Sequence, residues 1–221
     1  FKERKGHKKI RHENNRQMAP YKYLIVSEGK KTEPYYFEQI KKLINKKYND
    51  SITVEDRKID IEIKGTGKNT CDLVTFTQNY VNHSNNYYGS VWVIFDKDDF
   101  TDEQFNDAIK QAKDNGYNAG WSNESIELWF LLHFEYFQSA VGRQSYISKL
   151  NYYFRKFKLK EYKKNMKDIF DILIKYGSLD NAIKNAEKLM DKWNDENQSD
   201  QSKMKPATNV FKLVQELKEY F

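Results

Sequence analysis

The stretch VWVIFDKDDF, residues 91–100, runs from five apolar residues directly into three aspartates, Asp96, Asp98 and Asp99. A short apolar run bounded by polar residues is typical of a strand that is buried on both faces of a parallel sheet. Carboxylates this close repel one another, so their grouping requires a cause. The stretch therefore predicts a buried strand with a polar site beyond its carboxyl end.

The chain repeats this arrangement earlier, and helices separate the two strands. YKYLIVS, residues 21–27, is β-rich and nearly continuous in apolar character, and Glu28 and Gly29 follow it. Alternation of strands and helices favours a doubly wound α/β core with a mostly parallel sheet. Further strands are expected at 58–65 and 117–121, and helices at 32–47, 70–82 and 101–116.

The second half of the chain is predicted to be mostly helical. SNESIELWFLLHFE, residues 122–135, predicts a buried helix with Ser122 or Asn123 as its cap. Beyond it we expect helices at about 144–158, 161–175, 178–194 and 207–220. The expected organisation is a basic N-terminal arm over 1–19, an α/β core over 20–140, and a helical C-terminal region over 141–221.

Composition indicates a folded protein outside the membrane. Of the 221 residues, 38% are hydrophobic and 15% aromatic, more aromatics than a disordered chain would have. The longest dense apolar run, LWFLLHF at 128–134, is too short to span a bilayer, and no secretory signal pattern opens the chain. The single cysteine, Cys71, excludes a disulfide within one chain, and no Cys or His pair shows zinc-ligand spacing. We expect a cytoplasmic protein with no membrane partner.

Positive charge is concentrated in two segments. Residues 1–17 hold seven Lys and Arg against two Glu, which is most of the net charge of +6. The segment 149–167 holds eight Lys and Arg and interleaves them with aromatic residues. Basic and aromatic side chains together suit single-stranded RNA, so Arg155, Lys156 and Lys158 are candidate nucleic-acid contacts. The alternative is an amphipathic helix that buries its aromatics and leaves its lysines in solvent.

The two buried strands place acids at one edge of the predicted sheet. Ligands of an open parallel sheet bind beyond the carboxyl ends of its strands. If the strands are neighbours, Glu28, Asp96 and Asp98 converge, and three carboxylates in one crevice require a cation. Mg²⁺ is the ion expected, with Mn²⁺ as the alternative, and Glu28 either binds it or acts as general acid or base. The competing interpretation makes these acids turn residues and helix caps.

Other candidate residues stand close to this acidic set. Lys30 and Lys31 follow Glu28 and are placed to contact a phosphate, unless they belong to a solvated turn. Glu127 lies in the apolar helix predicted at 122–135, so it requires a partner, a metal or a capping role. His133 on the same helix is either a catalytic group or, more commonly for a lone histidine on an apolar helix, a core residue.

Four stretches resemble motifs of the RloB-like family in the same order: SEGKKTEPYYFEQI, FDKDDF, SNESIELWFLLHFE and PATNVFKLVQEL. The resemblance covers residues 21–218. It implies a Toprim fold, in which one glutamate and a later DxD pair bind magnesium; Glu28, Asp96 and Asp98 fill these positions, and the family motif keeps Glu127. It further implies prokaryotic phage defence by abortive infection, a separate ATPase partner, and an RNA target such as tRNA.

The leading hypothesis from the sequence is a magnesium-dependent endonuclease of antiphage defence. GTGKNT at 65–70 lacks the residues of a Walker A loop, since Glu62 and Asn69 occupy its key positions, so ATP hydrolysis falls to the partner. One alternative is a non-catalytic adaptor that docks an ATPase through its helical half. Another is a receiver-like domain that accepts a phosphoryl group at Asp96. The sequence leaves open RNA against DNA, one metal against two, and whether the chain forms a homo-oligomer.

Overall fold

A five-stranded sheet forms the centre of the molecule. The computed structural model describes residues 22–50, 59–98 and 100–221, so the predicted arm at 1–19 and Asp99 lie outside the described residues. The strand order is β2-β1-β3-β4-β5. The strands are β1 Lys22–Ser27, β2 Asp60–Gly65, β3 Ser90–Asp96, β4 Asn118–Asn123 and β5 Ala207–Thr208.

The order of the strands creates a switch point at the middle of the sheet. Strands β1 to β4 are parallel, and the short β5 pairs antiparallel to β4. Strand β2 lies outside β1, whereas β3 lies on the other side of β1. The chain therefore leaves β1 and β3 in opposite directions across the sheet, which opens a crevice beyond their carboxyl ends.

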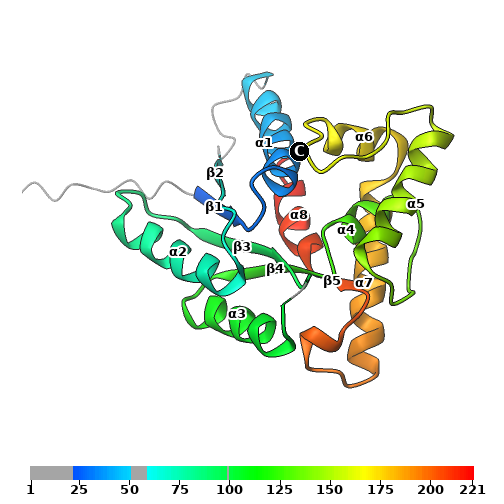
Figure 1. Ribbon diagram of the computed structural model, residues 1–221. Coiled ribbons are helices and arrows are strands. Elements are labelled where there is room, and N and C mark those ends of the chain that lie inside the picture. The colour runs from blue at the N-terminus through cyan, green and yellow to red at the C-terminus, as the bar shows by residue number, and fades with distance from the viewer. Residues whose placement is uncertain (1–21, 51–58, 99) are drawn as a thin grey trace, which may run out of the picture.

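Helices cover both faces of the sheet (Figure 1). Because successive side chains of a strand point to opposite faces, β1 sends Leu24 and Val26 toward α2 and α3, and Tyr23 and Ile25 toward the remaining helices. The helices are α1 Thr32–Asp50, α2 Thr70–His83, α3 Asp102–Asp114, α4 Glu127–Leu131, α5 Arg143–Lys156, α6 Ile169–Tyr176, α7 Leu179–Asp195 and α8 Val210–Lys218, with a 3₁₀ turn, η1, at Gln201–Lys203.

The prediction of a mostly parallel α/β sheet with C-terminal helices is confirmed. The C-terminal region also joins the core directly. One continuous hydrophobic cluster contains residues of β1, β3, α1 and every helix from α4 to α8. The two parts of the chain therefore share one packed interior on this face of the sheet.

Three predicted helices differ from the observed ones. Strand β4 continues through Ser122 and Asn123, so α4 is much shorter than the helix predicted at 122–135. Ser122 and Asn123 are stabilised in the strand rather than in a helix because β5 pairs with β4 at these residues, and the Ser122 and Thr208 hydroxyls lie 2.9 Å apart. For the same reason the segment predicted as helix from 207 begins as a strand. The third difference is α6, which begins at Ile169 rather than at the predicted 161.

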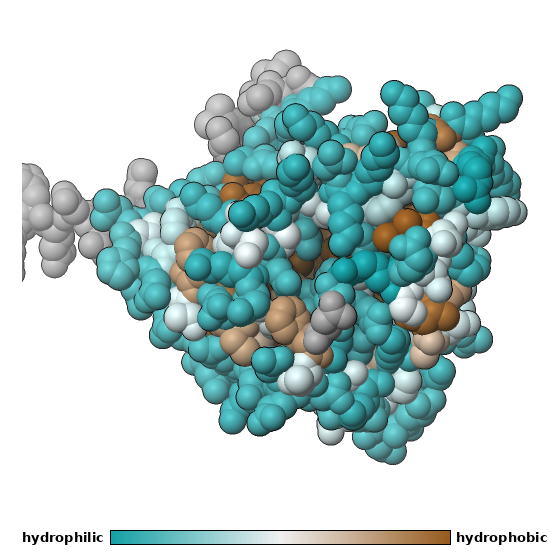
Figure 2. All heavy atoms as spheres, in the orientation of Figure 1, coloured by the Kyte–Doolittle hydropathy of each residue, from teal (hydrophilic) through white to brown (hydrophobic). Residues whose placement is uncertain are grey.

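The outer surface is largely hydrophilic on the face shown in Figure 2, with small hydrophobic patches between hydrophilic residues. Among the described residues, no helix has the length and apolar character needed to cross a membrane.

Candidate active site

A cavity of about 320 Å³ opens beyond the carboxyl ends of β1 and β3, at the switch point of the sheet. We call it the acidic cleft. It gathers five carboxyl groups and four cationic side chains from β1, β3, α1, α4 and the C-terminal region. Its charged lining residues are Glu28, Glu33, Asp96, Asp98, Glu127, Lys30, Lys31, Arg143 and Lys164.

Backbone hydrogen bonds fix Glu28 at the end of β1. Its N–H donates to the Ile94 carbonyl at 2.9 Å, and its own carbonyl accepts from the Gly67 N–H at 2.7 Å. Glu28 therefore continues the parallel pairing of β1 with β3 by one residue. This pairing brings Glu28 beside the end of β3, where Asp96 stands, as the sequence predicted.

Asp98 is held in an uncommon backbone conformation. Its φ is 37°, in the left-handed region that aspartate tolerates better than most residues. Its N–H donates to the Glu124 carbonyl at 3.1 Å, and the N–H of Lys97 donates to the Ser122 carbonyl at 2.9 Å. These bonds turn the chain sharply after Asp96, so that the Asp98 side chain also faces the cleft.

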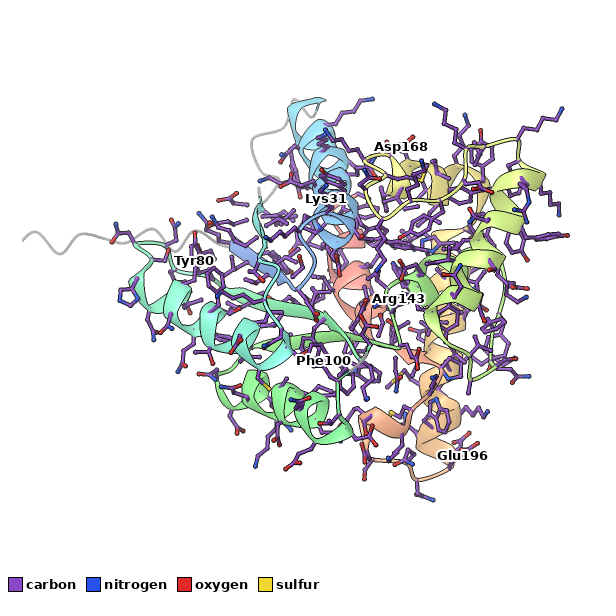
Figure 3. All side chains as sticks on the ribbon, viewed as in Figure 1. Lys31, Tyr80, Phe100, Arg143, Asp168 and Glu196 are labelled. Atoms are coloured by element: carbon purple, nitrogen blue, oxygen red, sulfur yellow. The ribbon has the colours of Figure 1, made fainter. Side chains whose placement is uncertain are left out.

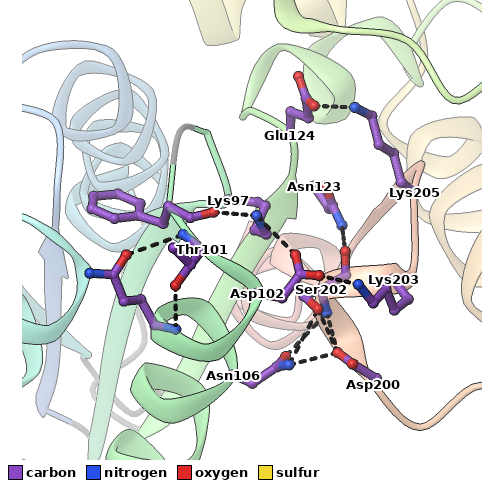
Figure 4. A network of polar contacts seen from close by, with 12 residues as sticks. Lys97, Thr101, Asp102, Asn106, Asn123, Glu124, Asp200, Ser202, Lys203 and Lys205 are labelled. Atoms are coloured by element: carbon purple, nitrogen blue, oxygen red, sulfur yellow. Dashed lines mark hydrogen bonds and ion pairs between the residues drawn. The ribbon is translucent and has the colours of Figure 1, made fainter.

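A network of polar contacts supports this turn from behind (Figure 4). Lys97 and Lys203 both pair with Asp102, which joins the segment after β3 to the segment after α7. Asn106 donates to Asp200 at 2.6 Å, and Asn123 donates to the Ser202 carbonyl at 2.8 Å. The C-terminal region therefore helps to position the acids that end β3.

Glu127 is buried in the floor of the cleft, with 1% of its surface exposed. Its Oε1 accepts a hydrogen bond from the Tyr162 hydroxyl at 3.0 Å, while its Oε2 has no partner among the described residues. A buried carboxylate oxygen without a donor is costly unless a cation or a proton occupies it. Glu127 therefore lines the acidic cleft, and it is not the cap of α4, whose N-cap position is Ile126.

Glu33 is a member of the cleft that the sequence interpretation missed. It lies in the first turn of α1, 5% exposed, and its Oε2 also lacks a partner among the described residues. An acid in the first turn of a helix is common, so its position gave no signal of another role. Gly29 makes room for it, because a Cβ at Gly29 would overlap the Glu33 carboxylate.

Arg143 is the second residue that the sequence did not single out. It begins α5, and Figure 3 shows it between the sheet and that helix. Its Nη2 lies 2.6 Å from Asp98 Oδ2 and 3.6 Å from Asp96 Oδ2. A cation at a helix N-terminus opposes the helix dipole, and this mismatch is the one sequence signal that could have marked it.

Crowding of the carboxyl groups changes their protonation. Burial, followed by repulsion from Glu33 and Asp98, raises the pKa of Glu28 to about 7, although the Asp96 backbone and Arg143 oppose the rise. Burial and the charges of Glu33 and Glu127 raise the pKa of Asp96 well above its usual range. Burial and Glu127 likewise raise the pKa of Glu33. The cleft therefore holds more carboxyl groups than it can keep ionised without an added cation.

The donor chemistry fits a hard divalent ion. Carboxylate oxygens are the ligands that Mg²⁺ and Mn²⁺ prefer, and unpartnered buried oxygens of Glu28, Glu33 and Glu127 face one cleft. In the described part of the chain, however, no three His, Cys, Asp or Glu side chains stand at the spacing that holds a metal ion. Arg143 instead contacts Asp98 and Asp96.

Comparison with protein families identifies the chain over nearly its whole length. The family described as RloB-like protein matches residues 23–217. The chain belongs to the RloB-like family. No curated protein and no solved structure matches it. The cleft lies within the matched residues, so all of its acidic and cationic lining residues belong to the part of this RloB-like chain that matches the family.

The basic residues predicted to contact nucleic acid lie outside the cleft of this RloB-like chain. Arg155, Lys156 and Lys158 are exposed at the end of α5, and Arg155 lies 3.7 Å from Glu161. Of the aromatics in the segment 149–167, Phe154 and Tyr162 are buried, whereas Tyr152 is 58% exposed. The amphipathic interpretation therefore describes part of this segment, and an exposed basic edge remains beside it.

His133 also lies outside the cleft. It is buried against Trp129, and its Nδ1 lies 3.0 Å from the Trp129 carbonyl, to which the neutral ring donates. Burial lowers the pKa of His133 to about 4. His133 is a core residue of the RloB-like fold.

Proposed function

We propose that this chain is a metal-dependent endonuclease that cleaves RNA such as tRNA, in prokaryotic antiphage defence and together with a separate ATPase. One observation carries the proposal: Glu28, Asp96 and Asp98 line one cleft, together with cations that suit a phosphate substrate. The defence role, the ATPase and the RNA target rest on the family resemblance, which extends over nearly the whole chain.

The cleft supports hydrolysis of a phosphodiester. Glu28, Asp96 and Asp98 would hold Mg²⁺ or Mn²⁺, which when bound would polarise a phosphate oxygen and favour deprotonation of water. Where Glu28 does not itself bind the ion, its carboxyl group can act as the general base that accepts the proton of the attacking water, because burial raises its pKa to about 7. Glu127 and Glu33 line the same cleft and would add carboxyl oxygens beside the bound cation.

Cationic side chains at the mouth of the cleft supply the contacts for a polyanion. Lys30 and Lys31 are exposed beside Glu28, and Lys164 is exposed on the other side. The hydroxyl of Thr32 donates to the Lys164 carbonyl at 2.7 Å, which fixes this lysine-rich segment at the cleft. Substrate phosphates would therefore meet positive charge before they reach the acids.

The proposal is tested by Glu28→Gln and Asp96→Asn, which keep side-chain size and remove charge. We expect each to lower RNA cleavage by at least about 100-fold with Mg²⁺ or Mn²⁺, and to abolish protection in a phage challenge. Glu103→Gln on the exposed side of α3 is the matched control, and it should cleave and protect like the unchanged protein. Undiminished cleavage by both cleft variants would rule the mechanism out.

A non-catalytic adaptor is the second candidate, and the Arg143 contacts favour it, because an arginine can balance the cleft charge without a metal. This alternative predicts that Glu28→Gln and Asp96→Asn leave phage protection intact. It also predicts that exposed substitutions on α5 and α7 abolish protection. The same phage challenge therefore separates the two functions.

A further inference from the structure

Asp96 and Asp98 are held by a cation that belongs to the chain itself. Arg143 Nη2 lies 2.6 Å from Asp98 Oδ2 and 3.6 Å from Asp96 Oδ2, so one nitrogen bridges the two acids. Among the described residues, neither aspartate makes another ion pair. Arg143 itself is 25% exposed, in the lining of the cleft.

The stability of α5 does not explain where Arg143 stands. It occupies the first position of α5, where the helix dipole disfavours a cation, and Gly142 before it provides no side-chain cap. Its Nε is buried without a partner among the described residues. The guanidinium therefore gives up part of its hydrogen bonding to reach the aspartates, and the acidic cleft is what attracts it.

The contact is well suited to exchange. Arginine binds a carboxylate most strongly through two parallel N–H donors, whereas here a single nitrogen serves both acids. A divalent ion held by Asp96 and Asp98 would require carboxylate oxygens of the same two residues. The guanidinium and a divalent ion therefore compete for one position.

We propose that Arg143 is the internal cation of the acidic cleft, and that a divalent ion displaces it from Asp96 and Asp98. This inference rests on the metal site of the proposed function. The cleft has a volume of about 320 Å³, which offers space into which the displaced side chain can move. Exchange adds positive charge among five carboxyl groups, which offsets the loss of the arginine contact.

Metal titration by calorimetry on the full chain tests the exchange directly. Arg143→Gln removes the competing cation, so we expect Mn²⁺ and Mg²⁺ to bind at least about tenfold more tightly than to the unchanged protein. Lys149→Gln on the same helix is the matched control, because Lys149 pairs with Glu135 at 2.9 Å outside the cleft. Its metal affinity should be unchanged. Equal or weaker binding by Arg143→Gln would overturn the exchange while leaving the metal site intact.

Two further arms complete the test. If none of the three proteins binds either ion, the metal site of the proposed function fails and the exchange fails with it. If Arg143→Gln does not fold, Arg143→Lys replaces it; its shorter reach weakens the contact, so tighter metal binding is again expected and equal binding overturns the exchange. Thermal unfolding gives a second readout: Mn²⁺ should raise the Tm of the variant more than that of the unchanged protein.

Discussion

At the scale of single residues, the acidic cleft depends on a missing side chain as much as on its acids. Gly29 follows Glu28, and the Glu33 carboxylate from the first turn of α1 folds back against its Cα. Any larger residue at 29 would occupy the volume of that carboxylate. The turn after β1 thus combines an acid, a glycine and a second acid in one compact unit.

Gly29→Ala is expected to displace Glu33 and to destabilise the protein by about 1–3 kcal/mol, the range seen for overpacking of a tight interior. Urea unfolding measures the change in the free energy of unfolding. Gly89→Ala is the control, because a Cβ at Gly89 meets nothing within 4 Å. A Gly29→Ala protein as stable as the control would show that Glu33 is not held in this position.

His133 gives a second prediction at this scale, concerning pH. Its pKa is about 4 in the folded protein and about 6.5 in the unfolded chain, so the unfolded state binds the extra proton between these values. The contribution of His133 to stability should therefore fall by roughly 3 kcal/mol as the pH falls from about 6.5 to about 4. Glu28, whose pKa burial raises to about 7, contributes in the opposite direction over this range, so the His133 contribution is read from the difference between two proteins. His133→Gln removes this contribution, so the difference in unfolding free energy between the unchanged protein and the variant should shrink by roughly 3 kcal/mol between about pH 6.5 and about pH 4. An equally steep curve in the variant would assign the acid sensitivity to other groups.

At the scale of elements, the sequence predicted the sheet better than the helices of the second half. The apolar runs of β1 and β3 and the capping box of Thr101 and Gln104 at the start of α3 are local signals, and the structure reproduces them. Strand β5 has only two residues and exists because β4 pairs with it. The paired residues are 84 and 86 positions apart in the chain, so the pairing leaves no local pattern to detect.

The same distinction separates the predicted members of the cleft from the missed ones. Glu28 and Asp96 were predictable because each directly follows a buried strand, and parallel strands end at one edge. Arg143 comes from α5, which reaches the cleft only through packing of the C-terminal region. Its place depends on tertiary structure, which the spacing of residues along the chain does not encode.

A substitution at Asn209 tests how much the C-terminal region stabilises the β4 edge of the sheet. Its Oδ1 accepts from the Trp121 N–H at 2.6 Å, and its Nδ2 donates to the Ala119 carbonyl at 2.8 Å. Asn209→Ala leaves both β4 groups without this partner, so the free energy of unfolding should fall by about 2–4 kcal/mol in urea unfolding. Asn181→Ala, at an exposed position of α7, should change it by less than about 0.5 kcal/mol. A small loss at Asn209 would mean that water replaces its bonds.

At the scale of the whole molecule, charge is divided between an acidic interior site and basic edges. The cleft holds five carboxyl groups, while the segment from Arg155 onward carries exposed lysines and reaches the cleft at Lys164. Tyr162, between them, donates to Glu127 at 3.0 Å, so this segment is anchored in the floor of the cleft. A polyanion that lies along the segment would therefore be directed toward the acids.

The triple change Arg155→Gln, Lys156→Gln and Lys158→Gln tests this path. We expect weaker RNA binding and a shallower salt dependence, because each lost phosphate contact lowers the slope of log K against log salt by about 0.7 for a single strand. Fluorescence anisotropy with a single-stranded RNA measures this slope, which should be reduced by about 2. The measurement uses the Glu28→Gln background, in which the proposed mechanism predicts no cleavage. The matched triple Lys110→Gln, Lys113→Gln and Lys184→Gln removes as much charge from α3 and α7, outside the lining of the cleft. Equal losses in both triples would mean that only net charge attracts RNA, whereas a loss confined to the first triple places the RNA along α5.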